Sequence, residues 1–186
     1  NCWGVNEVFL KSIQKIQETL QGTGFLRRGR FESYSGSYLC DCSSLFSSIL
    51  EIENISLYEE IARGNETLKS SDYFIYAKER NFYTDKISEL NLGDILCWKK
   101  DHIPKSGDSG HMALVISLPK KFEGSLYKVR VFDSTKVPHS NDSRDESGVG
   151  EGDLYLQSDE NGKIIGVRWS DKVQKVKRTP IIAIRL

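Results

Sequence analysis

The sequence lacks the features that would direct a chain into a membrane or onto nucleic acid. No apolar run approaches the roughly 20 residues that a membrane-spanning helix needs. The 26 Lys and Arg residues are matched by 26 Asp and Glu residues, so the formal net charge is zero, and the two signs are mixed along the chain. The chain has no internal repeat and no linker-like segment. We therefore expect no transmembrane segment and no nucleic-acid partner.

Cysteine and methionine are also scarce. Four cysteines in 186 residues are too few for a disulfide scaffold, although a disulfide among Cys2, Cys40 and Cys97 stays open. Met112 is the single methionine and the chain begins at Asn1, which indicates that an upstream segment has been removed. A cleaved signal peptide is one way in which this happens. We favour an exported location, periplasmic or secreted, while the sequence leaves the compartment open.

The length suits a single domain, residues 1–186, with a sizeable hydrophobic core. Hydrophobic periodicity predicts that the first half, 1–91, is mostly helical and that the second half, 92–186, forms a sheet. The expected helices cover 5–20, 42–54, 56–63 and about 66–80. The expected strands cover 94–99, 111–118, 127–132, 153–157, 164–169 and 181–185. This order predicts an α+β fold, with N-terminal helices packed on a C-terminal antiparallel β-sheet. We expect a monomer, although the sequence leaves the oligomeric state open.

Cys42 stands at the predicted start of a helix. Asp41 and Ser43 are residue types that cap helix N-termini. The apolar residues that follow at helical spacing are Leu45, Phe46, Ile49 and Leu50. Unpaired N–H groups and the positive end of the helix dipole favour an anion in the first turn, so we expect the thiol to be biased towards the thiolate. Cys42 is therefore the candidate nucleophile.

A histidine and an acid at strand ends supply the partners that such a cysteine needs. His111 enters an apolar run and is predicted to be the first residue of a buried strand. Asp133 follows the next strand-like run, where it could hold the imidazole in its useful tautomer. Nucleophilic catalysis requires a base within about 3 Å of the thiol and an orienting group behind it. The order Cys42, His111, Asp133 predicts a catalytic triad, with His139 as the alternative orienting group.

The segment from Ser134 to Gly152 is long, polar and charged. Structureless loops of this length are uncommon in compact domains and tend to be lids, binding loops or disordered segments. Because the segment starts directly after Asp133, it is placed to cover a substrate. Arg144 within it is a candidate clamp for a substrate carboxylate, and a solvated surface arginine is the alternative.

A metal site is the competing chemical hypothesis. Cys40 and Cys42 are separated by one residue, and Cys97, His102 and His111 are further candidate ligands. Structural zinc sites usually pair their ligands with the spacing C-x₂-C on both sides. One half-pair with a shorter spacing does not meet that pattern. We therefore expect no metal and no other cofactor.

Three short motifs resemble those of a known family. Asp41-Cys42-Ser43 precedes an apolar helix, and Leu92-Gly93-Asp94-Ile95-Leu96 and Gly110-His111-Met112-Ala113-Leu114-Val115 each open a strand. In this order they are similar to the NlpC-type cell-wall peptidases and the related CHAP amidases, both of the papain-like superfamily. The resemblance covers roughly Tyr38 to Thr135.

The resemblance implies a papain-like fold and a thiol hydrolase that cuts amide bonds, typically in peptidoglycan stem peptides or cross-links. Carried over residue by residue, Cys42 is the nucleophile, His111 the base and Asp133 the orienting residue. Asp41 and Ser43 match flanking residues that help to shape the family's substrate pocket.

Further expectations concern the surroundings of the nucleophile. The oxyanion would be held by the backbone N–H of Cys42 and by a second donor, for which Tyr38 is the candidate. Asp94 is expected to be structural and to fix the turn into the sheet. Ser44 replaces the glycine that is usual after Asp-Cys-Ser, and the loop after Asp133 is longer than in these enzymes, so the substrate could differ.

Two alternatives lie outside hydrolysis. A transglutaminase-like acyltransferase shares the order Cys, His, Asp, and incorporation of a labelled amine without net hydrolysis would favour it. A catalytically inactive binding module of the same fold is the other alternative. In that case an electrophile would label Cys42 no faster than Cys97.

Overall fold

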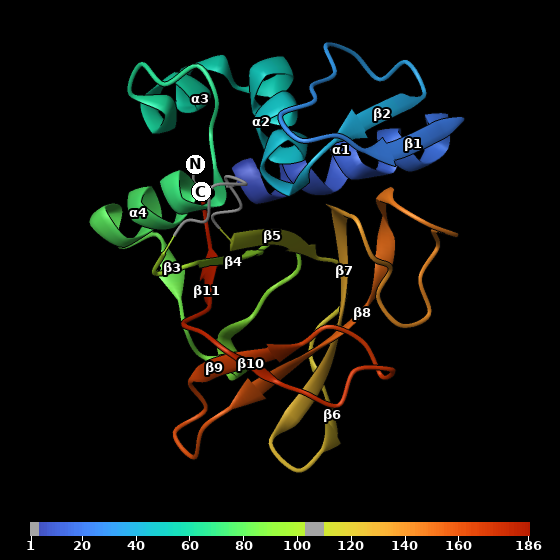
Figure 1. Cartoon of the computed structure of the whole chain (residues 1–186). Coiled ribbons are helices and arrows are strands. Elements are labelled where there is room, and N and C mark those ends of the chain that lie inside the picture. The colour runs from blue at the N-terminus through green and yellow to red at the C-terminus, as the bar shows by residue number, and fades with distance from the viewer. Residues whose placement is uncertain (1–3, 103–109) are drawn as a thin grey trace.

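The computed structural model describes residues 4–102 and 110–186. Its helices lie together on one side of a large, curved antiparallel sheet (Figure 1). The expected combination of packed helices with an antiparallel sheet is thus confirmed. In the part of the chain so described, no helix is both long enough and apolar enough to cross a membrane.

The helices begin and end close to the predicted positions. They are α1 (Val5–Thr19), α2 (Cys42–Glu53), α3 (Ile55–Ala62), α4 (Ser70–Arg80) and the short 3₁₀ turn η1 (Ile87–Glu89). In α1 the predicted apolar stripe is buried, with Phe9 and Ile16 fully enclosed. The start of α4 lies later than predicted, because the Asp72 carboxylate accepts the backbone N–H of Lys69 at 2.7 Å and fixes the helix start there.

The strands form one small parallel sheet and one large antiparallel sheet. They are β1 (Gly22–Phe25), β2 (Ser37–Cys40), β3 (Tyr83–Thr84), β4 (Ile95–Lys99), β5 (Gly110–Val115), β6 (Lys120–Glu123), β7 (Leu126–Thr135), β8 (Gly148–Ser158), β9 (Ile164–Arg168), β10 (Lys177–Arg178) and β11 (Ile182–Ile184). The large sheet has the order β10-β9-β8-β7-β5-β4-β11-β3, with β6 paired to β7. Each of the predicted strands is present as β4, β5, β7, β8, β9 or β11.

The large sheet is rolled, so one of its faces turns inward. An isolated bridge pairs Lys86, just after β3, with Lys163, just before β9, and so brings distant parts of the sheet together. Alternate residues of β4 divide between two hydrophobic clusters. Ile95 packs with the helices, whereas Leu96 packs inside the roll with residues of β7, β8 and β9. The sheet therefore contributes to both parts of the core.

The small sheet was not predicted, and it lies within the half of the chain expected to be helical. Its strands are short and pair in parallel across an intervening segment, which leaves no local hairpin signal. The Cys40 carbonyl accepts the Ser134 hydroxyl at 2.6 Å, and the Thr23 hydroxyl oxygen accepts the Val149 N–H at 2.8 Å. These bonds hold the segment that leads into Cys42 against the ends of β7 and β8.

Asp94 links three parts of the chain, in keeping with the structural role expected for it. Its fully buried carboxylate accepts the backbone N–H of Asn91 at 2.8 Å, the side-chain amide of Asn6 at 3.2 Å and two guanidinium N–H groups of Arg185, each at 3.0 Å. Gly93 before it has φ +85°, a left-handed conformation that favours glycine. The turn into β4 is thereby tied to α1 and to the C-terminal strand.

Candidate active site

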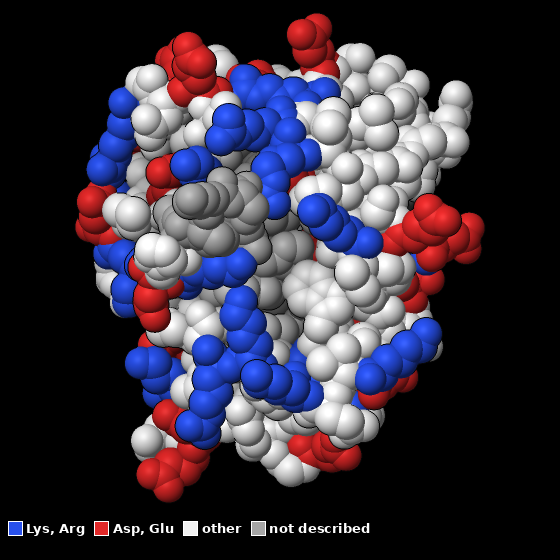
Figure 2. Space-filling model, in the orientation of Figure 1, with Lys and Arg blue, Asp and Glu red and all other residues white. Residues whose placement is uncertain are grey.

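A cavity of about 720 Å³ opens between the start of α2, strands β4 and β5, and strands β9 and β10. Cys42 lines it together with its neighbours Asp41 and Ser43, and His111 lines it from β5. The face seen in Figure 2 is hollowed near its centre, and Lys and Arg side chains gather around the hollow. The candidate nucleophile and the candidate base therefore share one cavity.

The predicted helix start at Cys42 is confirmed. Asp41 is the N-cap, and its carboxylate accepts the backbone N–H of Ser44 at 2.9 Å and the hydroxyl of Ser43 at 3.2 Å. Its other oxygen accepts the backbone N–H of Arg28 at 2.8 Å. The first N–H groups of a helix have no acceptor within the helix. The N–H of Cys42 is such a group, and it lies where a negative oxygen near the sulfur could accept it.

The expected bias of Cys42 towards the thiolate is wrong. Burial, followed by the negative charge of Asp41, raises the pKa of the Cys42 thiol well above its usual range. The backbone N–H groups of Met112 and Ser43 interact with the sulfur and oppose this rise without overcoming it. The resting form is the neutral thiol, so a nearby base must remove its proton before or during attack.

His111 is held by an acid and by two aromatic rings. Its Nε2 lies 2.6 Å from Oδ2 of Asp133, and its ring centroid lies 5.2 Å from that of Trp98 and 4.9 Å from that of Trp169. A carboxylate only accepts hydrogen bonds, so Nε2 is the nitrogen that carries the proton. Among the residues described, Nδ1 of His111 has no hydrogen-bond partner and is free to act as a base.

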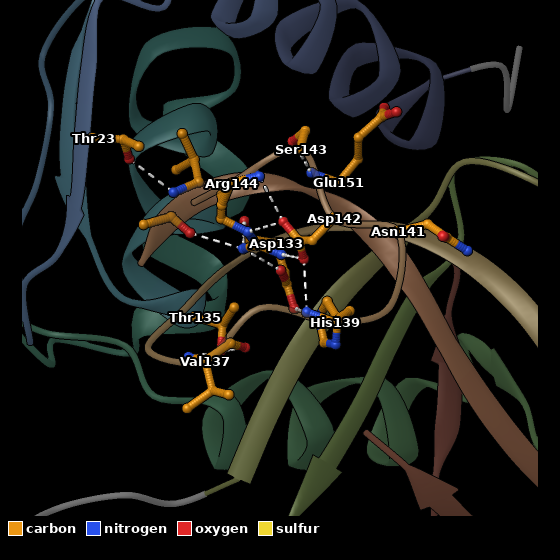
Figure 3. A network of polar contacts seen from close by, with 12 residues as sticks. Thr23, Asp133, Thr135, Val137, His139, Asn141, Asp142, Ser143, Arg144 and Glu151 are labelled. Carbon is orange, nitrogen blue, oxygen red and sulfur yellow. Dashed lines mark hydrogen bonds and ion pairs between the residues drawn. The ribbon is translucent and has the colours of Figure 1, made fainter. Parts of the chain in front are cut away.

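Asp133 is the centre of a buried polar network (Figure 3). The Oδ2 atom that meets His111 also accepts Nε2 of His139 at 2.8 Å, and Oδ1 accepts Nη1 of Arg144 at 2.8 Å. Arg144 in turn donates to Asp142 through Nε at 2.7 Å and Nη2 at 2.8 Å. The side chains of Asp133 and His139 are 0% exposed and that of Arg144 is 2% exposed. The orienting acid is thus fixed from two further sides.

The charges in this network support one another. Burial by itself would raise the pKa of Asp133, but His139 and His111 outweigh it and hold that pKa well below its usual range. Burial by itself would lower the pKa of His139, but the charge and hydrogen bond of Asp133 outweigh it and raise that pKa. Asp133 is therefore a carboxylate at neutral pH and a permanent acceptor for His111.

The sulfur and the imidazole lie near each other without a direct hydrogen bond. His111 and Met112 are consecutive in β5, and the N–H of Met112 interacts with the Cys42 sulfur while the His111 ring lines the same cavity. Across the described part of the chain, no hydrogen bond joins Cys42 to His111. Catalytic hydrogen bonds are often long in the free enzyme and tighten when substrate binds. The structure thus joins Asp133 to His111 and places His111 and Cys42 on one cavity, without a hydrogen bond between Cys42 and His111.

Tyr38 does not lie where a second oxyanion donor is needed. Its ring is fully buried, in edge contact with Phe31, and its hydroxyl is 2.6 Å from the Thr19 hydroxyl. Tyr38 belongs to β2, where alternate residues point to opposite sides, and its side is the core. The N–H of Ser43, also in the first turn of α2, interacts with the Cys42 sulfur and is the second donor that we propose in place of Tyr38.

The segment 134–152 is not a lid, and Arg144 is not a clamp for substrate. Strand β7 extends to Thr135 and β8 begins at Gly148, so the connection is shorter than expected. Arg144 does not line the cavity, because its guanidinium is occupied by Asp133, Asp142 and the Gly148 carbonyl. Thr135 and Lys136, at the start of the segment, line the cavity, whereas His139 and Arg144 pack against Asp133.

One group of described residues has the composition of a metal site. Ligand atoms of His111, Asp133 and His139 lie within 4.8 Å of one another. Both imidazoles already bond to Asp133, and the Arg144 guanidinium on its second oxygen would repel another cation. The network therefore fits hydrogen bonding better than metal binding.

Three of the zinc ligands considered from sequence lie outside this network: Cys40 and Cys97 are buried free thiols and His102 is exposed. Cys2 lies outside the described residues.

Sequence reasoning missed the aromatic support of the two histidines. Trp169 stands between them, with its ring centroid 4.3 Å from His139 and 4.9 Å from His111, and its carbonyl is 3.2 Å from Nδ1 of His139. Trp98 closes the other side of His111. Nothing in the spacing of these tryptophans points to the site, because Trp169 is distant in the sequence from both histidines and the Trp98 contact depends on the pairing of β4 with β5.

Comparisons with known proteins leave the activity open. No family model matches the sequence, and no solved structure matches it. A protein of Acanthamoeba polyphaga mimivirus, itself described as uncharacterised, is 26% identical over 176 residues, which span 80% of this chain and 78% of that protein. The chain is therefore similar over most of its length to a viral protein, and the geometry of the cavity is the basis for a function.

Replacing Arg144 by Met tests the buried network. We expect the free energy of unfolding to fall by about 3–5 kcal/mol, because Asp133 and Asp142 lose their buried partner. Urea denaturation followed by tryptophan fluorescence measures the change. Arg63→Met is the matched control, since Arg63 pairs with Glu79 on the surface and its loss should change stability far less. Equal effects of the two substitutions would contradict the role of Arg144.

The pH dependence of stability tests His139. Because the folded-state pKa of His139 is raised, its stabilising contribution is complete below the unfolded value of roughly 6.5 and is lost as pH rises through the folded-state pKa. His139→Gln should therefore lower the free energy of unfolding more at about pH 5.5 than at about pH 9. Urea titrations at both pH values give the difference. His102→Gln, at an exposed position, is the control and should show no such dependence. A loss that is independent of pH for His139→Gln would refute the ion pair.

Proposed function

We propose that this protein is a cysteine hydrolase of the papain-like kind, which cleaves an amide bond through a thioester intermediate. One observation carries the proposal: Cys42 at the start of α2 and His111, backed by Asp133, line the same cavity. A nucleophile, a base and an orienting acid in that relation are the parts that acyl transfer from an amide requires.

In the proposed first step, Nδ1 of His111 removes the thiol proton of Cys42 while the sulfur attacks the amide carbonyl. The C–S bond forms, and the carbonyl oxygen becomes an oxyanion that the N–H groups of Cys42 and Ser43 stabilise. Since burial and Asp41 raise the pKa of the thiol, proton transfer accompanies the attack rather than preceding it. His111 is then positively charged beside Asp133.

In the following steps, His111 donates its proton to the leaving nitrogen, and the C–N bond breaks to release an amine. Water then attacks the thioester, His111 accepts a proton from that water, and the C–S bond breaks. A carboxylic acid leaves, and the Cys42 thiol is restored by the proton on His111. Asp133 stabilises the charged imidazole in both halves of the reaction and keeps Nδ1 as the reacting nitrogen.

The motifs around these residues suggest the substrate. Asp41-Cys42-Ser43, the strand opener with Asp94, and Gly110-His111 resemble the cell-wall peptidases, so we propose peptidoglycan peptides as the first substrates to test. We propose further that the protein acts as an exported monomer without a cofactor. The cavity volume of about 720 Å³ is in the range of sites that enclose a small ligand or a few residues of a peptide.

Cys42→Ala tests the proposed activity. We expect product formation from purified peptidoglycan, read by mass spectrometry, to fall by at least about 10³-fold, because the thioester cannot form. Cys97→Ala is the matched control and should retain activity, since Cys97 is buried beneath α4 with its thiol donating to the Ser70 carbonyl at 3.3 Å. Equal product from the wild type and Cys42→Ala would end the proposal that this thiol is the nucleophile.

A further inference from the structure

The charge that lines the cavity differs sharply from the charge of the whole chain. Seven described residues of its lining are Lys or Arg and one, Asp41, is acidic, whereas the full sequence has 26 of each sign. Figure 2 shows the basic side chains on several sides of the hollow. Because the composition is balanced, the fold has gathered these cations at the site.

The cations come from segments that are distant in the sequence. Arg27 and Arg28 precede β2, Lys69 precedes α4, Lys136 follows β7, and Lys175 precedes β10. Each of these segments contains or adjoins acidic residues in the sequence. The local net charge along the sequence therefore does not reveal the basic cluster. The folded chain places their basic side chains around one opening.

Five of the seven cations in the lining have no ion-pair partner among the described residues. No ion pair within the described residues involves the side chain of Arg27, Arg28, Lys69, Lys136 or Lys175. The Lys136 ammonium instead lies 5.2 Å from the centre of the Phe25 ring in β1. Like charges held close together without partners repel one another and oppose folding. The basic cluster therefore does not serve the stability of the fold.

The single acid of the lining does not balance them. The Asp41 carboxylate is occupied by Ser43, Ser44 and the backbone N–H of Arg28, where it caps α2. Its role is local, and the remaining charged residues of the lining, histidine aside, are all basic. Trp98 and Trp169 form apolar walls, and low-dielectric walls strengthen the field that cations exert inside a cleft.

We infer that the substrate of this site carries two or more negative charges close to the bond that is cut: a peptide-like amide bearing several carboxylate or phosphate groups. The inference rests on the proposed function, because it places that charge around Cys42. Neutral and basic peptides are disfavoured by the same field. Carboxylate and phosphate groups both carry the inferred negative charge, so the experiment tests each of them separately.

Alkylation of Cys42 measures the field directly, without any substrate. Iodoacetate and iodoacetamide are similar in size, differ in charge, and react by the same displacement of iodide by sulfur. The ratio of their rates at Cys42, read by peptide mass, reports how strongly the site attracts an anion. We compare the wild type with the combined substitutions Arg28→Gln, Lys69→Gln and Lys175→Gln, none of which alters the triad.

The control combines Lys11→Gln, Lys120→Gln and Lys121→Gln, which change the net charge equally at exposed positions outside the cavity lining. We expect the ratio of iodoacetate to iodoacetamide rates to fall by about tenfold in the cavity variant and less than about twofold in the control, in line with the focusing of charged clefts. Equal falls would overturn the inference. If the cavity variant does not fold, the wild-type ratio must itself drop between low and high salt, because added salt screens the field.

Binding separates the two kinds of anion. Calorimetry with Cys42→Ala and either tripolyphosphate or tricarballylate shows which group the cavity prefers, and binding of neither overturns the inference. Tighter binding of a single-stranded oligonucleotide than of both small anions would also overturn it, in favour of a nucleic-acid surface. If Cys42→Ala loses hydrolysis but the cavity variant keeps the wild-type alkylation ratio, the proposed hydrolase is supported and the anionic substrate is contradicted.

If Cys42→Ala keeps hydrolysis but the alkylation ratio falls in the cavity variant, the anion site is supported and the proposed role of Cys42 is contradicted.

Discussion

The Asp133 carboxylate is the interaction on which the candidate site depends. It is completely buried and accepts hydrogen bonds from His111, His139 and Arg144. A buried carboxylate with a single partner would be costly to desolvate, whereas three donors that include two cations hold it in its charged form. The imidazole of His111 consequently has one fixed tautomer and one fixed orientation. His111 and Cys42 line the same cavity.

This arrangement explains why the segment after β7 is folded back onto the molecule. His139 and Arg144 reach Asp133 from that segment, and Trp169 packs between the two histidines. The segment thus supports the triad from behind, and the cavity stays open at the front for a substrate. In the proposed function, the basic side chains around the opening would select the charge of the substrate, and the buried network would hold the base.

Much of this was predictable from local patterns, and the rest depended on contacts between distant residues. The apolar spacing after Cys42 and the capping type of Asp41 are local signals, and the helix begins there. The apolar run that predicts the strand near His111 is local in the same sense.

The parallel pair β1 and β2 has no such signal, because its strands meet through a long connection. Arg144 lies in a polar segment, where an arginine is usually at the surface. Only the fold places it against Asp133. The pKa of Cys42 was misjudged because a helix start can be recognised in the sequence, whereas the burial of the thiol cannot.

The most direct test of the site is the alkylation rate of Cys42 by iodoacetamide near neutral pH in the wild type, His111→Gln and His102→Gln. We predict that His111→Gln alone slows it by at least about tenfold, because the base that takes the thiol proton is gone. Equal rates in all three proteins would contradict the pairing of Cys42 with His111.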